Sequence, residues 1–67
     1  MKLPPLKALA YFNSAASQAS FKAAASELSV TEGAVSRQIK RLETYFGHAL
    51  FERAGRGVRL TSRGEKL

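Results

Sequence analysis

A cluster of polar and basic residues between positions 32 and 40 has the types and spacing that contact nucleic-acid bases. Its members are Glu32, Gly33, Ser36, Arg37 and Lys40. An arginine can donate two hydrogen bonds to guanine, and a glutamate can accept one from cytosine N4. Glycine carries no side chain, so a helix backbone can approach a groove closely at that position. The cluster therefore suits the reading of base edges in the major groove of DNA.

A second set of residues suits contact with phosphates. Lys22, Thr31 and Arg41 flank the first cluster, and the N-termini of nearby helices would add amide donors. A short glycine-containing stretch further along adds three arginines: Arg53, Arg56 and Arg59. Arg56 stands between two glycines, where a slim loop could enter a minor groove. Arginine is favoured there because a narrow minor groove has an enhanced negative potential.

Each of these features also has a purely structural interpretation. A basic outer face on a helix is commonly only its solvated face. Glu32 could serve only the positive N-terminal end of a helix, and the stem of Arg53 could cover apolar surface. His48 is interpreted as an ordinary surface residue. The joint occurrence of a basic helix, a tight turn before it and an arginine-bearing hairpin favours DNA binding.

Two helices are expected in the first thirty residues. The first runs from about 5 to 17, because apolar residues recur there at helical spacing. Its stripe comprises Leu6, Leu9, Phe12 and Ala16. The second runs from about 21 to 28, with Ser20 as its N-cap. Its stripe comprises Phe21, Ala24, Ala25 and Leu28, and the alanines allow another helix to approach closely.

The third helix is expected from about 32 to 46 and carries the first cluster. Thr31 is its N-cap, and Gly47 is the residue type that commonly ends a helix in the left-handed conformation. Its core stripe comprises Val35, Ile39, Leu42 and Phe46, and the opposite face comprises Gly33, Arg37, Lys40 and Thr44. The break before it is only about three residues long. Two helices joined in this way form a helix-turn-helix, whose second helix lies in the major groove.

The remaining residues predict a hairpin and the start of another helix. Two short strands, 50–53 and 58–60, surround a glycine-containing turn at 54–57. Thr61 is a candidate N-cap for a fourth helix. The sequence stops at Leu67, within the first turns expected for this helix. We therefore divide the chain into a DNA-binding domain at 1–60 and the truncated start of a linker helix at 61–67.

Composition narrows the class of protein. The formal net charge of +6 suggests an anionic partner, and residues 36–67 carry +5 of it. The chain has no cysteine and one histidine, which excludes a disulfide and argues against a metal site. No apolar run approaches the roughly 20 residues that span a bilayer, and no signal peptide is recognisable. A cytoplasmic protein without contact to a membrane is expected.

One pattern extends over almost the whole chain. Its centre comprises Ser20-Phe21-Lys22-Ala23-Ala24-Ala25, Leu28-Ser29-Val30-Thr31 and Ala34-Val35-Ser36-Arg37-Gln38-Ile39-Lys40-Arg41-Leu42-Glu43. Its continuation comprises Gly47, Leu50, Phe51, Arg53, Leu60, Thr61 and Gly64. The pattern resembles LysR-type bacterial transcriptional regulators. The opening residues 3–9, Leu-Pro-Pro-Leu-Lys-Ala-Leu, are similar to the branch that contains glycine-cleavage and β-lactamase regulators.

The resemblance implies a mainly α fold, a winged helix-turn-helix with a three-helix core, a two-stranded wing and the start of a linker helix. It implies base contacts by Glu32, Gly33, Ser36 and Arg37, and phosphate contacts by Thr31, Lys40, Arg41 and Arg53. Arg56 would be the wing residue at the minor groove. The family often has glutamine where this chain has Glu32, and phosphates repel a carboxylate, so base contact by Glu32 stays open. The family also implies a dimerising linker helix, a homodimer or tetramer and a large ligand-sensing domain, with no cofactor in the present part.

Other classes of function fit the sequence less well. An enzyme is disfavoured because one histidine and five dispersed acids supply no nucleophile, base and orienting group. A membrane-surface peptide is disfavoured because the apolar side of the third helix is needed for a core. A module that binds a partner helix in an apolar groove is the main alternative. Steep weakening by salt would distinguish DNA binding from it.

Overall fold

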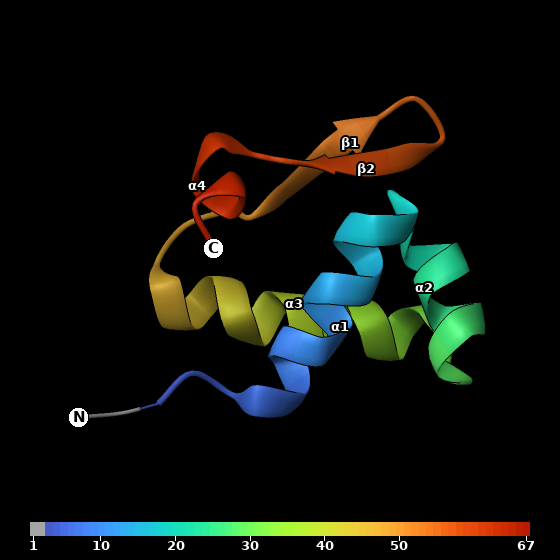
Figure 1. Ribbon diagram of the computed structural model, residues 1–67, viewed down its shortest axis with the longest axis horizontal. Helices are drawn as coiled ribbons and strands as arrows, with labels where there is room; N and C mark the ends of the chain where they lie inside the picture. Colours follow the sequence, from blue (N-terminus) through green and yellow to red (C-terminus); the bar gives the residue numbers. More distant parts are fainter. Residues whose placement is uncertain (1–2) are drawn as a thin grey trace.

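The computed structural model describes residues 3–67 and is mainly α-helical, as the sequence predicts. Its elements are α1 (Leu6–Gln18), α2 (Phe21–Leu28), α3 (Glu32–Phe46), β1 (Phe51–Ala54), β2 (Gly57–Leu60) and α4 (Ser62–Glu65). Helices α1, α2 and α3 pack against one another, and the antiparallel β1–β2 hairpin lies over the end of α1 that leads into α2 (Figure 1). None of the helices in this part of the chain is long and apolar enough to cross a membrane.

Hydroxyl side chains begin three of the helices at the positions that the sequence indicates. Ser20 Oγ, Thr31 Oγ1 and Thr61 Oγ1 each accept a hydrogen bond from the backbone N–H three residues further on, at 3.0, 3.0 and 3.1 Å. Each hydroxyl satisfies a donor that the first helical turn leaves without an internal partner. Gly47 ends α3 with φ 76°, which confirms the expected left-handed cap.

Helices α1 and α2 end at residues of types that are unusual in the left-handed region. Ala19 ends α1 with φ 55° and Ser29 ends α2 with φ 59°. This conformation is uncommon for residues other than glycine, so surrounding contacts have to hold it. The Ala19 carbonyl accepts a hydrogen bond from the Val58 N–H of β2 at 3.0 Å, and the Ser29 N–H donates back to Ala25 and Ser26. The turn between α1 and α2 is thereby attached to the hairpin.

The core lies between the three helices and the first strand. Its buried residues are Ala8, Tyr11, Phe12, Ala15, Ala24, Ala25, Val35, Ile39, Leu42, Leu50 and Phe51. Four alanines let the helix backbones approach closely. The ring of Phe51 lies 5.3 Å from that of Phe12 and 5.4 Å from that of Phe21, at tilted and edge-on angles that aromatic pairs favour. Phe51 therefore joins the hairpin to α1 and α2.

The buried face of α1 differs from the expected stripe. Phe12 is buried and Leu9 and Ala16 are half-buried, but Leu6 is 72% exposed. The most deeply buried positions of α1 are instead Ala8 and Ala15. The reason is that α1 packs against both α2 and α3, so small residues occupy its crowded interior face. The expected stripe of larger residues is only partly turned toward the core.

The hairpin is one residue longer at its turn end than the sequence analysis expected. Ala54 pairs with Gly57, which leaves Gly55 and Arg56 as a two-residue turn. Gly55 has φ 58°, whereas Arg56 lies outside the left-handed region. Glycine at the first central position is typical of a type II′ turn, which suits the twist of paired strands. The turn places Arg56 at the tip of the hairpin.

The backbone of Leu50 connects α3, the hairpin and α4. Its N–H donates to Glu43 Oε2 at 2.8 Å, and its carbonyl accepts from the Thr61 N–H at 2.9 Å. Gly64 lies against the same carbonyl so closely that a Cβ at that position would be 2.2 Å from the oxygen. We name these four residues the Leu50 junction. It sets how α4 leaves the domain relative to α3.

Candidate nucleic-acid interface

Helix α3 forms an exposed ridge with the predicted base-contacting residues on it. Val35, Ile39 and Leu42 are buried, which confirms the core stripe, while Phe46 at the end of the helix is half-buried. Glu32, Gly33, Ser36, Arg37 and Lys40 are all exposed. The separation of Gly33, Arg37 and Lys40 from the core stripe follows from the helical period, because residues three and four apart lie on one face.

A groove with a volume of about 390 Å³ runs between α3, the start of α2 and the hairpin. We call it the wing groove. It is lined by four predicted DNA-contacting cations: Lys22, Lys40, Arg53 and Arg56. The carboxylates of Glu32, Glu43 and Glu52 also line it. The Glu43 carboxylate accepts a hydrogen bond from the Leu50 N–H. The fold thus brings these four cations together beside α3, although Lys22 and Arg56 are 34 positions apart in the sequence.

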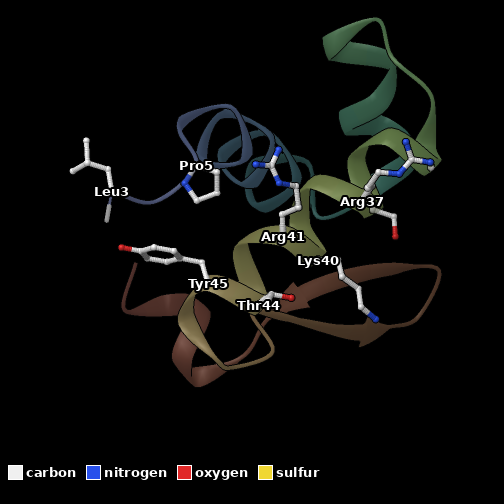
Figure 2. A pocket seen from close by; sticks show the side chains of 9 residues that line it. Leu3, Pro5, Arg37, Lys40, Arg41, Thr44 and Tyr45 are labelled. Atoms are coloured by element: carbon white, nitrogen blue, oxygen red, sulfur yellow. The ribbon is translucent and has the colours of Figure 1, made fainter. Parts of the chain in front are cut away.

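A second groove, with a volume of about 780 Å³, lies on the other side of α3. We call it the N-terminal groove, and its lining residues are Leu3, Pro5, Gly33, Ser36, Arg37, Lys40, Arg41, Thr44 and Tyr45. In Figure 2, Tyr45 is directed toward Leu3, whereas Lys40 is directed toward the hairpin. The sequence analysis placed Thr44 on the outer face of the helix but assigned it no contact, and it did not single out Tyr45.

The three hairpin arginines differ in their surroundings. Arg59 Nε lies 2.7 Å from Glu52 Oε2, and the two residues are partners across the strands. Both side chains are largely exposed, so this pair contributes at most about 1 kcal/mol to stability. Arg53 and Arg56 are exposed and line the wing groove. The hairpin therefore presents two arginines toward the groove and holds the third in an ion pair on its surface.

The first turn of α3 holds Thr31, Glu32 and Gly33. Thr31 Oγ1 caps the helix by accepting from Ala34, and a hydroxyl that accepts can still donate. Glu32 lies in the first turn, where a carboxylate interacts favourably with the helix dipole. A Cβ on Gly33 would meet only Thr31 Oγ1, at 4.0 Å. Packing inside the domain gives no reason for glycine here, although glycine costs a helix about 1 kcal/mol relative to alanine.

The geometry defines a class of protein. Helices α2 and α3 are joined by a short turn, α1 packs across both, and an antiparallel hairpin follows α3. A three-helix core with such a hairpin is a winged helix-turn-helix, in which α3 is the recognition helix and the hairpin is the wing.

The chain belongs to the LysR family of bacterial regulatory helix-turn-helix proteins, whose family model matches residues 6–65. It is 52% identical over 64 residues to the glycine cleavage system transcriptional activator of Escherichia coli K12, a match that covers 96% of this chain and 21% of that protein. It is 54% identical over 65 residues to the transcriptional regulator TrpI of Pseudomonas aeruginosa, covering 97% of this chain and 22% of TrpI. The chain thus spans about one fifth of the length of these regulators.

The fold is also similar to that of a DNA-binding domain solved on DNA. The structure of the CbnR DNA-binding domain in complex with DNA superposes with a TM-score of 0.87 at 35% sequence identity, and the match covers 92% of this chain and 71% of that one. The chain therefore has the fold of a DNA-binding domain of the LysR family.

Proposed function

We propose that this chain is the sequence-specific DNA-reading domain of a LysR-type transcriptional regulator. In this proposal α3 enters the major groove and Glu32, Gly33, Ser36 and Arg37 face the bases. Lys22, Thr31, Lys40, Arg41 and Arg53 lie along the phosphates, and Arg56 enters the adjacent minor groove. The observation that carries the proposal is the exposed ridge of α3, which is basic, has a glycine that the fold does not require, and faces away from the core.

The proposal extends to the protein that contains this domain. Because the relatives named above are transcriptional regulators about five times longer, we propose that α4 continues as a linker helix into a ligand-sensing domain, and that two or four copies assemble through it. The domain itself would act without catalysis and without a cofactor, in the cytoplasm, where bacterial DNA lies.

Salt dependence tests the proposed DNA binding. We expect the logarithm of the association constant for duplex DNA to fall linearly with the logarithm of the salt concentration, with a slope of about −3 to −4, because each phosphate-bound cation contributes about −0.9. Fluorescence anisotropy with a labelled duplex between 50 and 200 mM salt would measure this slope. Over that range of salt the affinity should fall by about two orders of magnitude. A nearly flat dependence would instead indicate an apolar partner-binding groove and contradict the proposal.

Substitution of Arg37 tests the base-reading role of α3. Arg37→Ala should weaken binding to the specific site by about 1–3 kcal/mol and relax the preference at one base pair, because a bidentate contact to guanine would be lost. The measurement compares specific and random duplexes at one salt concentration. Arg63→Ala is a matched control, since Arg63 is exposed on α4 and lies in neither groove. An equal loss on both duplexes would show that Arg37 contacts phosphate only.

A further inference from the structure

The wing is attached by its backbone to the turn between α1 and α2. The Val58 N–H of β2 donates to the Ala19 carbonyl at 3.0 Å. A Cβ on Gly57 would lie 2.2 Å from the same oxygen and 3.9 Å from the Ser20 Cα. Gly57 itself lies outside the left-handed region, so the space beside it, and not its backbone conformation, excludes a side chain. Strand β2 and the turn are therefore in direct backbone contact.

The hairpin has an outward-facing amide at the position of this contact. Ala54 pairs with Gly57 and closes the two-residue turn, and the next pair along the strands is Arg53 with Val58. In an antiparallel ladder, hydrogen-bonded pairs alternate with pairs whose N–H groups face away from the partner strand. The Val58 N–H therefore faces away from β1 and can bond outside the hairpin. The wing docks on the helices through this amide without losing a hydrogen bond of its own.

The contact lies near the tip of the wing, because Gly57 follows Arg56 directly in the sequence. The base of the wing is held separately. There the N–H groups of Leu50 and Phe51 donate to Glu43 Oε2 at 2.8 and 3.4 Å. Figure 1 shows β2 passing over the turn between α1 and α2 on its way from the tip to the base. A hairpin held only at its base could pivot, and the contact near the tip opposes this.

The turn between α1 and α2 offers the wing a carbonyl of defined direction. Ala19 ends α1 with φ 55°, and Ser20 caps α2 by accepting from the Ala23 N–H at 3.0 Å. The two helices thus hold the turn from both sides. A binding site needs its contacting groups held within about 0.5 Å of their working positions by surrounding contacts. The turn can supply this for the tip of the wing.

A side chain at position 57 would move the tip. Carbon and oxygen atoms in contact are about 3.3 Å apart or more, so a Cβ only 2.2 Å from the Ala19 oxygen would force strand and turn apart by about 1 Å. The distance from the Val58 nitrogen to that oxygen would then reach about 4 Å, which is too long for a hydrogen bond. Arg56 would shift relative to α3, while the hydrogen bonds at the base of the wing would not be touched directly.

We propose that Gly57 and the Ala19 carbonyl are positioning groups for minor-groove recognition. Their contact sets the height and angle of the wing over the start of α2, so that Arg56 reaches the minor groove while α3 occupies the neighbouring major groove. Neither group contacts DNA in this proposal. The inference rests on the proposed function, because it needs Arg56 in the minor groove.

A double-mutant cycle tests the proposal. Arg56→Ala and Gly57→Ala are made singly and together, and affinity is measured on two duplexes that differ only in an A·T-rich or a G·C-rich flank beside the half-site. Each single variant should weaken binding to the A·T-flanked duplex about tenfold and to the G·C-flanked duplex less than about threefold. The double variant should bind within about twofold of Gly57→Ala, because a displaced Arg56 no longer contributes. Arg37→Ala should keep its full effect in the Gly57→Ala background.

Ala19→Gly is the matched control, because it removes a methyl group beside the same contact and leaves the carbonyl in place. It should bind both duplexes within about twofold of the parent, since glycine adopts a positive φ readily. Urea denaturation should show that every variant is folded under the conditions of the binding measurement. Amide hydrogen exchange of the parent adds a test that needs no variant. The Val58 N–H should be protected from exchange, although it faces away from β1.

Three results would overturn the proposal. One is a deficit of Arg56→Ala that is the same in the parent and in the Gly57→Ala background. Another is a loss of affinity in Gly57→Ala that is equal on both duplexes, since Gly57 would then support the domain as a whole. The third is a Val58 amide that exchanges as fast as an unprotected one. Arg56→Ala without effect on either duplex in the parent would instead contradict the minor-groove contact in the proposed function, and this inference with it.

Discussion

Replacement of Gly64 by alanine is expected to destabilise the domain by about 2–3 kcal/mol, within the range for forcing extra atoms into a packed interior. The added Cβ would lie 2.2 Å from the Leu50 carbonyl oxygen and 3.0 Å from a methyl group of Leu60. The backbone oxygen cannot move without weakening its hydrogen bond from Thr61 or shifting the Leu50 N–H away from Glu43. A domain of this length has roughly 3–10 kcal/mol of total stability, so the loss is a large share.

Gly33→Ala is the matched control for this experiment. Its Cβ would project into open space on the surface of α3, so the variant should be as stable as the parent or up to about 1 kcal/mol more stable, because alanine is the better helix former. Urea denaturation of the three proteins, followed by far-ultraviolet circular dichroism, measures the difference. Equal midpoints for Gly64→Ala and the parent would show that α4 moves away from Leu50 at little cost, and the Leu50 junction would then not hold α4 in place.

Extension of the chain through the whole linker helix is expected to raise its affinity for a two-half-site operator by about 10²–10⁴, through effective concentration and without new base contacts. In the present chain α4 spans only Ser62–Glu65, and isolated helices shorter than about 12–15 residues are marginal in water. So short a helix offers too little surface for a helix–helix interface. The 67-residue chain should therefore be mainly monomeric in dilute solution and bind a single half-site weakly.

Sedimentation of the 67-residue and extended chains at micromolar concentration measures their oligomeric states. Titration with operators that contain one or two half-sites measures how the oligomeric state changes the affinity for DNA. The extended form should be a dimer that prefers two half-sites about one helical turn, or a multiple of it, apart. A stable dimer of the 67-residue chain would place the interface within the winged domain and contradict this account. Equal affinity of the extended form for one and two half-sites would contradict it as well.

The sequence alone determined the features that depend on short stretches of chain. The caps Ser20, Thr31 and Thr61 and the glycine end of α3 were predicted correctly, because each makes hydrogen bonds within four residues of itself. The buried stripe through Val35, Ile39 and Leu42 follows from the helical period. The exposed positions of Gly33 and Arg37 follow from the same period, since they lie on the side of α3 opposite that stripe. Their contacts with DNA stay predictions.

Only the tertiary structure decided how separate segments meet. The buried face of α1 depends on α2 and α3 together, which is why Leu6 is exposed and Ala8 and Ala15 are buried. The left-handed Ala19 is hydrogen-bonded to Val58 of β2, and Gly64 lies against the carbonyl of Leu50. In both pairs the two residues are far apart in the sequence. The two grooves beside α3 likewise exist because the hairpin and the N-terminal segment pack on opposite sides of it. Such contacts have no local period or cap in the sequence, because they arise where backbones from distant segments approach one another.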